Sequence, residues 1–333
     1  MAPVAASRGP VIVPPSRIDR LTSFSELFAT VQARRESGDL AGALALFEGR
    51  ERDFPSQQGL VFLVRAELLV ELRQPDRAIE SLDAALLSGC RYKRSWLEEN
   101  PRLAALRNLE RFRDVTERSA RRYEEDSAAA RPELTVVMPE NAAPRAGYPL
   151  LVALHGNNST MADTVGHWSS PTRAGWVVAV PQSSEIGVSP GVFTWNETDR
   201  TVREVTAHIS EIAKRARLDP DRLMMGGFSM GGLQAMALPL TARIRAHAFI
   251  AVAPWLPRIG EFATMLDRGP GRELSGYVVV GTRDPSSDGA KQLVALLTKH
   301  RVRAHLDLRE ELGHDYPADM PETLDRALSF ASV

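Results

Sequence analysis

The sequence has 333 residues, of which 44% are hydrophobic and 25% are charged, and its 41 Lys and Arg nearly balance its 42 Asp and Glu. Such a composition is ordinary for a globular protein, and the length allows about two domains of ~150 residues each. The charge balance creates no overall field that would attract nucleic acid or an anionic membrane surface. We therefore expect no nucleic acid as a partner.

Cys90 is the single cysteine, so an intrachain disulfide is excluded and the reducing cytoplasm is the expected location. Residues 1–20 contain several prolines and no continuous apolar core behind a basic start, which predicts a flexible leader and not a signal peptide. A membrane span needs about 20 consecutive apolar residues, and the sequence has no such run, so we expect none.

Helical periodicity dominates residues 21–126, where apolar side chains recur at spacings of three and four. Ala43 and Phe47 stand 35 residues before Ala78 and Leu82, close to the period of about 34 in tetratricopeptide repeats. The segment SGDLAGALALF that ends at Phe47 resembles the turn and second helix of that family, in which small residues let paired helices approach closely. Residues 96–115 resemble the helices that close such domains.

Two repeats are fewer than such arrays usually need to stand alone, so we expect this helical domain to pack on the next one. A purely structural role and a site for a protein partner or carrier both stay open. Asp126–Pro132 is predicted to be the linker.

Residues 132–333 alternate short β-branched runs with helical stretches, which predicts a mostly parallel sheet with helices on both faces. The expected strands are Glu133–Met138, Pro149–Leu154, Trp176–Val180, Leu223–Gly226, Ala248–Ala253, Tyr277–Gly281 and Ala304–Leu308. The expected helices are Asp199–Arg217, Gly232–Leu240, Gly289–His300 and Pro321–Ala331. Asp219–Arg222 is expected to be a turn that leads into the fourth strand.

The motif G-x-S-x-G appears as Gly227-Phe-Ser-Met-Gly231, between a short apolar run and a segment rich in alanine and leucine. A serine at such a sharp strand-to-helix turn is lifted above the sheet edge, and the glycines leave room for the tight backbone. The first N–H groups of the helix then face any negative charge beside Ser229. The motif therefore indicates a serine hydrolase, although the five residues alone also fit an ordinary Gly- and Ser-rich turn.

Four segments together resemble the α/β-hydrolase superfamily and occur in its order: LHGNN at residues 154–158, LDPDRLMMGGFSMGG at 218–232, GTRDP at 281–285 and GHDYP at 313–317. They are most similar to phospholipase/carboxylesterase, dienelactone-hydrolase and polyester-depolymerase-like esterases. The resemblance implies an α/β-hydrolase fold over residues 132–333, preceded by the all-α tetratricopeptide-like domain.

A serine hydroxyl is a weak nucleophile at neutral pH and needs a base in hydrogen-bonding reach. The resemblance assigns this role to His314, whereas His167, His208, His247, His300 and His305 lack such a context. The base needs a carboxylate partner, and Asp284 fits the chain order serine, aspartate, histidine. Asp288 is the nearest substitute for Asp284, and Asp315 is disfavoured because it adjoins His314.

The oxyanion of an acyl-transfer transition state needs preorganised N–H donors. The backbone N–H of Met230 is the expected first donor, and the resemblance implies the backbone N–H of Asn157 as the second. His155 is then expected to brace that loop instead of acting as a second base.

Four aromatic residues are candidates for substrate binding. Trp195 and Phe193 lie in a segment, residues 191–196, that resembles an aromatic loop near the acyl group of related esterases, and Trp168 and Trp255 follow strand ends. Each also fits a buried core aromatic. The segment between Trp255 and Ser275 is too short for a large lid, which suggests an open cleft that the helical domain roofs.

The sequence thus predicts a hydrolase of small-molecule carboxylic esters or thioesters that acts through an acyl-enzyme on Ser229. A peptidase or acyltransferase with the same triad is an alternative, as is a tetratricopeptide-type interaction protein with an inactive hydrolase domain. No P-loop, dinucleotide fingerprint, H-E-x-x-H or paired-cysteine motif occurs, so neither a cofactor nor a metal is expected.

Overall fold

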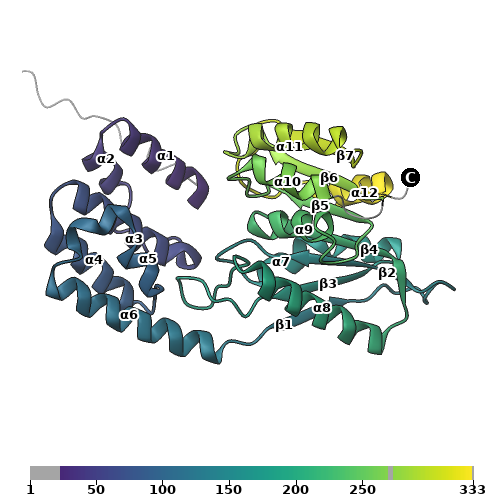
Figure 1. Ribbon diagram of the computed structural model, residues 1–333, viewed down its shortest axis with the longest axis horizontal. Coiled ribbons are helices and arrows are strands. Elements are labelled where there is room, and N and C mark those ends of the chain that lie inside the picture. Colours follow the sequence, from purple (N-terminus) through teal and green to yellow (C-terminus); the bar gives the residue numbers. More distant parts are fainter. Residues whose placement is uncertain (1–22, 269–272, 332–333) are drawn as a thin grey trace, which may run out of the picture.

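The computed structural model describes residues 23–268 and 273–331, and in it a helical part lies beside a sheet covered by helices (Figure 1). The predicted leader, residues 1–20, lies outside the described residues. The domain limits expected from the sequence stay a prediction.

From residue 23, where the described part begins, six α-helices build the amino-terminal part: α1 (Phe24–Glu36), α2 (Leu40–Ala45), α3 (Gln58–Glu71), α4 (Pro75–Leu87), α5 (Arg94–Glu98) and α6 (Glu110–Ala129), with short 3₁₀ turns at Pro55–Gln57 and Pro101–Leu106. Side chains cap the first two helices, because Ser23 and Asp39 accept hydrogen bonds from the N–H groups of Glu26 and Gly42. Ala43 and Ala78 are both fully buried in one core, at equivalent places in the two helix pairs. Membership of these pairs in the tetratricopeptide family stays a prediction.

The linker expected at Asp126–Pro132 is wrong over its first residues, because α6 continues to Ala129. Alanine has the highest helix propensity, so the run Ala128-Ala129 prolongs the helix until Pro132 approaches. Only Ala130–Pro132 separate α6 from the first strand.

In the described part of the chain the sheet has seven strands: β1 (Glu133–Val137), β2 (Tyr148–Leu154), β3 (Val177–Gln182), β4 (Leu218–Phe228), β5 (Ala248–Val252), β6 (Ser275–Gly281) and β7 (Arg303–Arg309). Their order is β1-β3-β2-β4-β5-β6-β7, and every pairing is parallel except that of β1 with β3. All seven strands predicted from the sequence are confirmed, within a few residues at their ends.

The turn expected at Asp219–Arg222 is wrong, because β4 already begins at Leu218. The strand first pairs Leu218 with Tyr148 and then Leu223 with Leu150, so the register shifts between the two pairs. The extra residues of β4 are largely exposed. A bulge of this kind lets a polar segment stay in solvent without ending the strand.

Among residues 133–268 and 273–331, six helices accompany the sheet: α7 (Met161–Trp168), α8 (Thr198–Arg215), α9 (Met230–Leu240), α10 (Ile259–Arg268), α11 (Ser287–Lys299) and α12 (Met320–Ala331), with a 3₁₀ turn at Ser170–Ala174. The four predicted helices correspond to α8, α9, α11 and α12, whereas α7 and α10 are additional. Side chains of β2 alternate between two cores, Leu150 and Val152 with α8 to α11, and Leu151 and Ala153 with α7 and α12. The predicted mostly parallel sheet with helices on both faces is therefore confirmed.

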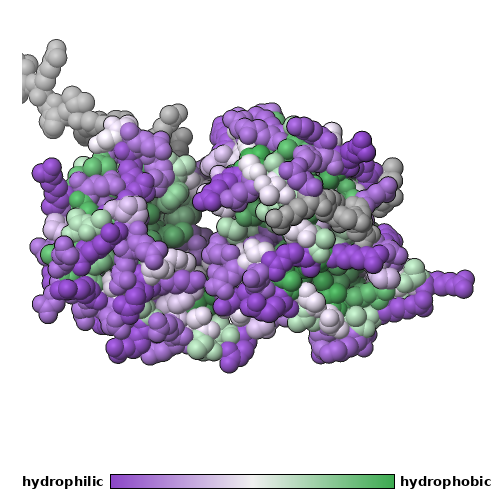
Figure 2. All heavy atoms as spheres, in the orientation of Figure 1, coloured by the Kyte–Doolittle hydropathy of each residue, from purple (hydrophilic) through white to green (hydrophobic). Residues whose placement is uncertain are grey.

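The carboxyl ends of the parallel strands lie on the side of the helical part. The antiparallel strand β1 starts just after α6, and its first residue, Glu133, lies opposite Gln182, the last residue of β3. Figure 2 shows the surface hollowed between the helical part and the region of α9 to α11. None of the helices within the described ranges is long and apolar enough to cross a membrane.

Candidate active site

Ser229 stands at the turn between β4 and α9, with φ of 53° and ψ of −118°. A positive φ is uncommon for a residue with a side chain and marks local backbone strain. The neighbouring glycines allow the turn to close, since a side chain at Gly227 would overlap the backbone of Gly231, and one at Gly231 would overlap the carbonyl oxygens of Leu154 and His155. The turn thus presents the Ser229 hydroxyl at the carboxyl edge of the sheet.

Three side chains from separate strand ends form one hydrogen-bonded chain. His314, which follows β7, has its Nε2 atom 2.9 Å from Ser229 Oγ, and its Nδ1 atom lies 2.8 Å from Oδ2 of Asp284, which follows β6. The Asp284 side chain is fully buried, and its Oδ1 accepts a hydrogen bond of 2.7 Å from the backbone N–H of Ser286. The contact with Ser229 is in the range needed for a general base to take the hydroxyl proton, and the contact with Asp284 is in the range of a hydrogen bond that orients the ring.

The two other aspartates considered from the sequence have different partners. Asp288 is exposed and pairs with Lys291 Nζ at 2.9 Å. Asp315 accepts a hydrogen bond of 2.7 Å from the backbone N–H of its neighbour, Tyr316. The geometry therefore favours Asp284 as the carboxylate that orients His314.

The two expected oxyanion donors, the backbone N–H groups of Met230 and Asn157, stay a prediction. Met230 is the first residue of α9, so its N–H has no acceptor within the helix. The loop that carries Asn157 approaches from β2, because a Cβ atom placed on Gly156 would lie 2.9 Å from the Phe228 ring and 3.6 Å from Ser229 Cβ. Backbone N–H groups at both places are suited to a negatively charged oxygen near the serine.

His155 is buried and bonded to backbone on both sides of its ring. Its Nδ1 lies 2.7 Å from the carbonyl oxygen of Gly156, and its Nε2 lies 3.4 Å from the N–H of Ser183. Burial lowers the pKa of His155 to about 4. A neutral ring that donates through Nδ1 and accepts through Nε2 satisfies both contacts, which is the bracing arrangement expected from the sequence.

The pocket aromatics divide into two pairs. Trp168 and Trp195 are fully buried, the first beneath Gly226 with its Nε1 atom 3.3 Å from Tyr316 Oη, and the second with its ring 4.9 Å from His155. Rings this deep are positioned to support the site and not to touch a substrate. Phe193 is half-buried, and Trp255 is 45% exposed with its N–H bonded to Ser229 O at 3.0 Å, so these two stay candidates.

A small β-hairpin between β3 and α8 was not recognised in the sequence. Two backbone bonds close it, from Gly187 N to Val192 O and from Thr194 N to Glu185 O, each 2.8 Å long. The segment Gly187-Val-Ser-Pro-Gly191 contains the turn residues that indicate such a reversal. This hairpin, residues 185–194, lies beside the loop that carries Asn157.

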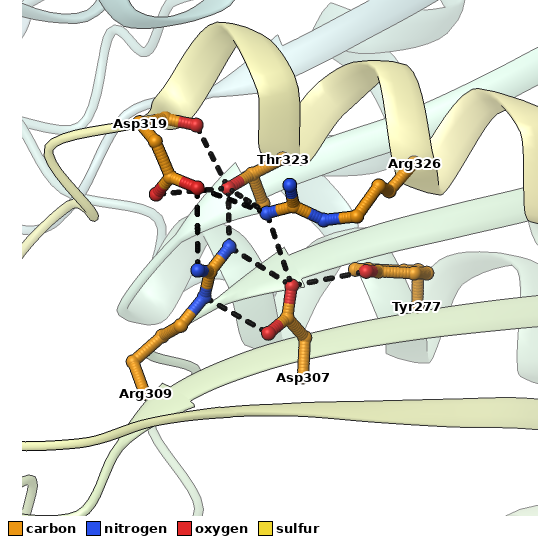
Figure 3. A network of polar contacts seen from close by, with 6 residues as sticks. All are labelled: Tyr277, Asp307, Arg309, Asp319, Thr323 and Arg326. Atoms are coloured by element: carbon orange, nitrogen blue, oxygen red, sulfur yellow. Dashed lines mark hydrogen bonds and ion pairs between the residues drawn. The ribbon is translucent and has the colours of Figure 1, made fainter.

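A second missed feature is the polar network in Figure 3, which connects both ends of the segment that carries His314. Arg309, the last residue of β7, pairs with Asp307 at 2.9 Å and with Asp319 at 3.2 Å, and it donates a hydrogen bond of 2.6 Å to Thr323 of α12. Arg326 adds a contact of 3.1 Å to Asp319. The segment 310–318 therefore starts and ends at one ion-pair cluster.

Residues that commonly bind metals are dispersed in the structure. Within residues 23–268 and 273–331, no group of three or more His, Cys, Asp or Glu side chains could hold a metal ion. Cys90 is buried in the helical core, and this burial raises the pKa of its thiol to about 11.

No model of a known protein family matches the chain. Over 199 residues the chain is 30% identical to a bifunctional acetylxylan esterase/xylanase, XynS20E, of Neocallimastix patriciarum. The match covers 59% of this chain and 27% of that protein, so the chain spans only about a quarter of the length of this curated relative.

Solved structures extend the comparison to the fold. An uncharacterized protein from Bacillus cereus ATCC 10987 has a TM-score of 0.52 at 23% identity, covering 93% of this chain and 98% of that one. Esterase PE8 has a TM-score of 0.51 at 16% identity, covering 60% of this chain and 98% of its own. The sheet domain has the α/β-hydrolase fold. The Bacillus protein shares the arrangement along nearly the whole chain, including the helical part.

Proposed function

We propose that this protein is a serine hydrolase that cleaves carboxylic esters or thioesters through an acyl-enzyme intermediate on Ser229. The observation that carries the proposal is the chain of hydrogen bonds from Ser229 through His314 to Asp284, with the serine on a strained turn. The curated relative, which has an esterase activity in its name, supports the same class of reaction.

In the proposed acylation step, Ser229 Oγ attacks the acyl carbon while His314 Nε2 takes the hydroxyl proton. The new Oγ–C bond leaves a negative charge on the former carbonyl oxygen, which accepts hydrogen bonds from the N–H groups of Met230 and Asn157. Asp284 accepts a hydrogen bond from the Nδ1–H group of His314, so it holds the ring in the right tautomer and stabilises the imidazolium.

The tetrahedral intermediate then collapses, and the bond to the leaving group breaks as His314 returns its proton to the leaving oxygen or sulfur. In the second half of the reaction, a water molecule gives a proton to His314 and attacks the acyl carbon. The second tetrahedral intermediate collapses as the Oγ–C bond breaks and His314 gives its proton to Ser229 Oγ, which releases the carboxylic acid and restores the serine hydroxyl. The cycle needs no group from outside the chain other than water.

The decisive experiment is labelling of the folded protein with a fluorophosphonate probe, followed by mass spectrometry to locate the adduct. We expect one adduct, on Ser229, and no label on Ser229→Ala. If folded wild type stays unlabelled, or if Ser229→Ala labels equally well, the proposed nucleophile is wrong. Ser286→Ala, which changes another serine near the site, serves as a control for nonspecific labelling.

The proposal names the substrate only as a carboxylic ester or thioester. A panel of test substrates would identify the preferred acyl group and leaving group. Nitrophenyl esters of increasing chain length report the size of the acyl site, and acyl thioesters test the leaving group. Acetylated xylan belongs in the panel because the curated relative is named an acetylxylan esterase. Phe193 and Trp255 are proposed to line the acyl site, so Trp255→Ala is expected to change the chain-length preference more than the maximal rate.

The same proposal includes the domain limits, the cellular location and a partner of the helical domain. It divides the protein into a leader at residues 1–20, a tetratricopeptide-like domain at 21–126 and the catalytic domain at 132–333. A cytoplasmic location fits the single free cysteine, Cys90. A protein partner or carrier at the helical domain is tested by measuring whether acyl-carrier thioesters are cleaved faster than the free thioesters.

A further inference from the structure

The tip of the hairpin at residues 185–194 is built into the helical domain. Val188 is only 4% exposed and belongs to the apolar core of the helical domain, together with helix residues such as Leu68 and Leu82. Its neighbour Ser189 is fully buried. The hairpin thus crosses from the catalytic domain into the core of the other domain.

Three buried hydrogen bonds hold this tip. Arg91 donates its backbone N–H to Val188 O at 2.9 Å and its Nη1 to Ser189 O at 2.7 Å. The N–H of Gly59 donates to Ser189 Oγ at 2.9 Å. Arg91 is 5% exposed and its Nε lies 3.2 Å from Asp126, so its charge is compensated where it is buried.

Two glycines on the helical domain leave the space that the hairpin tip occupies. A Cβ atom on Gly59 would lie 2.8 Å from Val188 Cγ2, and one on Gly89 would lie 2.9 Å from Pro190 Cγ. Such distances are too short for real carbon contacts, so both glycines are needed for the hairpin to approach this closely.

The base of the same hairpin is bonded to the loop with the proposed oxyanion donor. Asn158 N donates to Phe193 O at 2.9 Å, and Phe193 N donates to Ser159 O at 3.1 Å. The side chain of Asn157 accepts a hydrogen bond from Trp195 N at 3.0 Å and donates one to Asn196 Oδ1 at 2.7 Å. Every one of these contacts comes from the hairpin or from the residues that directly follow it.

The helix that follows Ser229, α9, is also hydrogen-bonded to the residues that follow the hairpin. Gln234 of α9 is buried and donates from Nε2 to Trp195 O at 2.8 Å. The residues after the hairpin therefore lie between the helix that begins at Met230 and the loop that carries Asn157. A displacement of the hairpin would change the distance between the two proposed donors.

We propose that the helical domain positions the oxyanion-binding site of the catalytic domain through this hairpin, with Arg91, Val188 and Ser189 as positioning residues. The inference rests on the proposed hydrolase function. A two-stranded hairpin is at best marginally stable in water, so its geometry depends on what holds its tip. The binding site for the oxyanion requires donors at a defined place, and a misplacement of about 1 Å costs up to about 100-fold in rate.

The test compares two buried arginines of the helical domain in the full-length protein. Arg91→Ala removes a bond to the hairpin tip, whereas Arg35→Ala removes ion pairs with Glu67 and Glu71, which both lie on α3 inside the helical domain. Active sites are first counted by fluorophosphonate titration, and turnover of a nitrophenyl ester is expressed per labelled Ser229. Affinity for an alkyl trifluoromethyl ketone, which forms an anionic tetrahedral adduct with serine, then reports the oxyanion site itself.

For Arg91→Ala we expect kcat per labelled site to fall about 10- to 100-fold, KM to change less than about threefold, and the ketone to bind more weakly by a similar factor as kcat. For Arg35→Ala we expect lower thermal stability but unchanged kcat per labelled site and unchanged ketone affinity. Ser189→Ala, which removes a single hydroxyl, should show a smaller loss in the same direction and keeps the test decisive if Arg91→Ala does not fold.

If Arg91→Ala and Ser189→Ala retain kcat per site and ketone affinity, the hairpin contact is only structural and the inference is wrong. Equal losses in Arg35→Ala would also overturn it, because they would show a general effect of a weakened helical domain. Failure of the proposed function looks different, since wild type itself would then show neither labelling of Ser229 nor turnover.

Discussion

His314 Nε2 lies 2.9 Å from Ser229 Oγ although the two residues are 85 positions apart in the chain. They follow β7 and β4, and β5 and β6 lie between these strands in the sheet. Three strand spacings of about 4.8 Å amount to roughly 14 Å, so the segment after β7 must reach across the sheet edge to bring the ring over the serine. The proposed reaction therefore depends on how the segment after β7 places the His314 ring relative to Ser229 Oγ.

The ion-pair cluster at the ends of this segment is expected to control the placement of His314 (Figure 3). Arg309→Ala removes the contacts to Asp307, Asp319 and Thr323, and we expect kcat to fall about tenfold or more because the ring loses its alignment. Arg309→Lys keeps the charge but not the two-pronged geometry, so partial activity is expected. Steady-state kinetics of ester hydrolysis measure kcat for both Arg309 variants.

Arg326→Ala is the matched control for the cluster, because Arg326 contacts the same carboxylates, at 3.7 Å from Asp307 and 3.1 Å from Asp319. Its side chain is 45% exposed, and exposed ion pairs contribute only about 0–1 kcal/mol. We expect near-normal turnover. A larger loss in Arg326→Ala than in Arg309→Ala would contradict the role assigned to Arg309.

Asp284→Asn should lower kcat by a factor on the order of 10⁴, because an amide does not hold the histidine in the required tautomer. The change is nearly isosteric, so the buried side chain still fits and the protein should fold normally. Asp288→Asn is the control, since Asp288 is exposed and pairs with Lys291. If Asp284→Asn is nearly as active as wild type while Asp288→Asn is not, the carboxylate has been assigned to the wrong residue.

Gly231→Ala is expected to abolish activity and to lower the free energy of unfolding. The added methyl group would overlap the carbonyl oxygens of Leu154 and His155, and backbone atoms do not move aside without displacing the turn at Ser229. Gly166→Ala in α7 is the comparison, because no atom lies within 4 Å of the added Cβ. There alanine should stabilise by up to about 1 kcal/mol. Urea unfolding and ester turnover of both variants test the contrast.

The stability of the protein should decline as the pH falls below about 6.5. Burial lowers the pKa of His155 to about 4, so the folded state keeps this ring neutral while the unfolded chain takes up a proton. The contribution is complete above pH 6.5 and is lost progressively towards pH 4, by about 1.4 kcal/mol per pH unit. Urea unfolding at pH 7 and pH 5 measures the difference.

The variant that tests this contribution is His155→Gln. In it, the difference in the free energy of unfolding between pH 7 and pH 5 should be smaller than in wild type. Burial also lowers the pKa of His208, which is only half-buried, so His208→Gln should remove a smaller part of the difference. An unchanged pH dependence in His155→Gln would show that other groups dominate it.

Most of the fold was predictable because it follows from local patterns. Short apolar runs identified all seven strands, whereas the helices α7 and α10, which are only 8 and 10 residues long, were not recognised. The residues proposed for the site were also suggested by short local motifs. A strained turn and its flanking glycines leave a compact motif around Ser229, the resemblance to α/β-hydrolases pointed to His314, and the chain order favoured Asp284.

What the sequence alone determined was the set of chemically suited residues and the strands that carry them. Only the tertiary structure decided that Trp168 and Trp195 are buried supports, that the tip of the hairpin at residues 185–194 enters the helical domain, and that Arg309 joins both ends of the His314 segment. These features depend on contacts between residues far apart in the chain. Hydrophobic periodicity and short motifs describe neighbours along the chain, so they contain no information on which distant surfaces fit together.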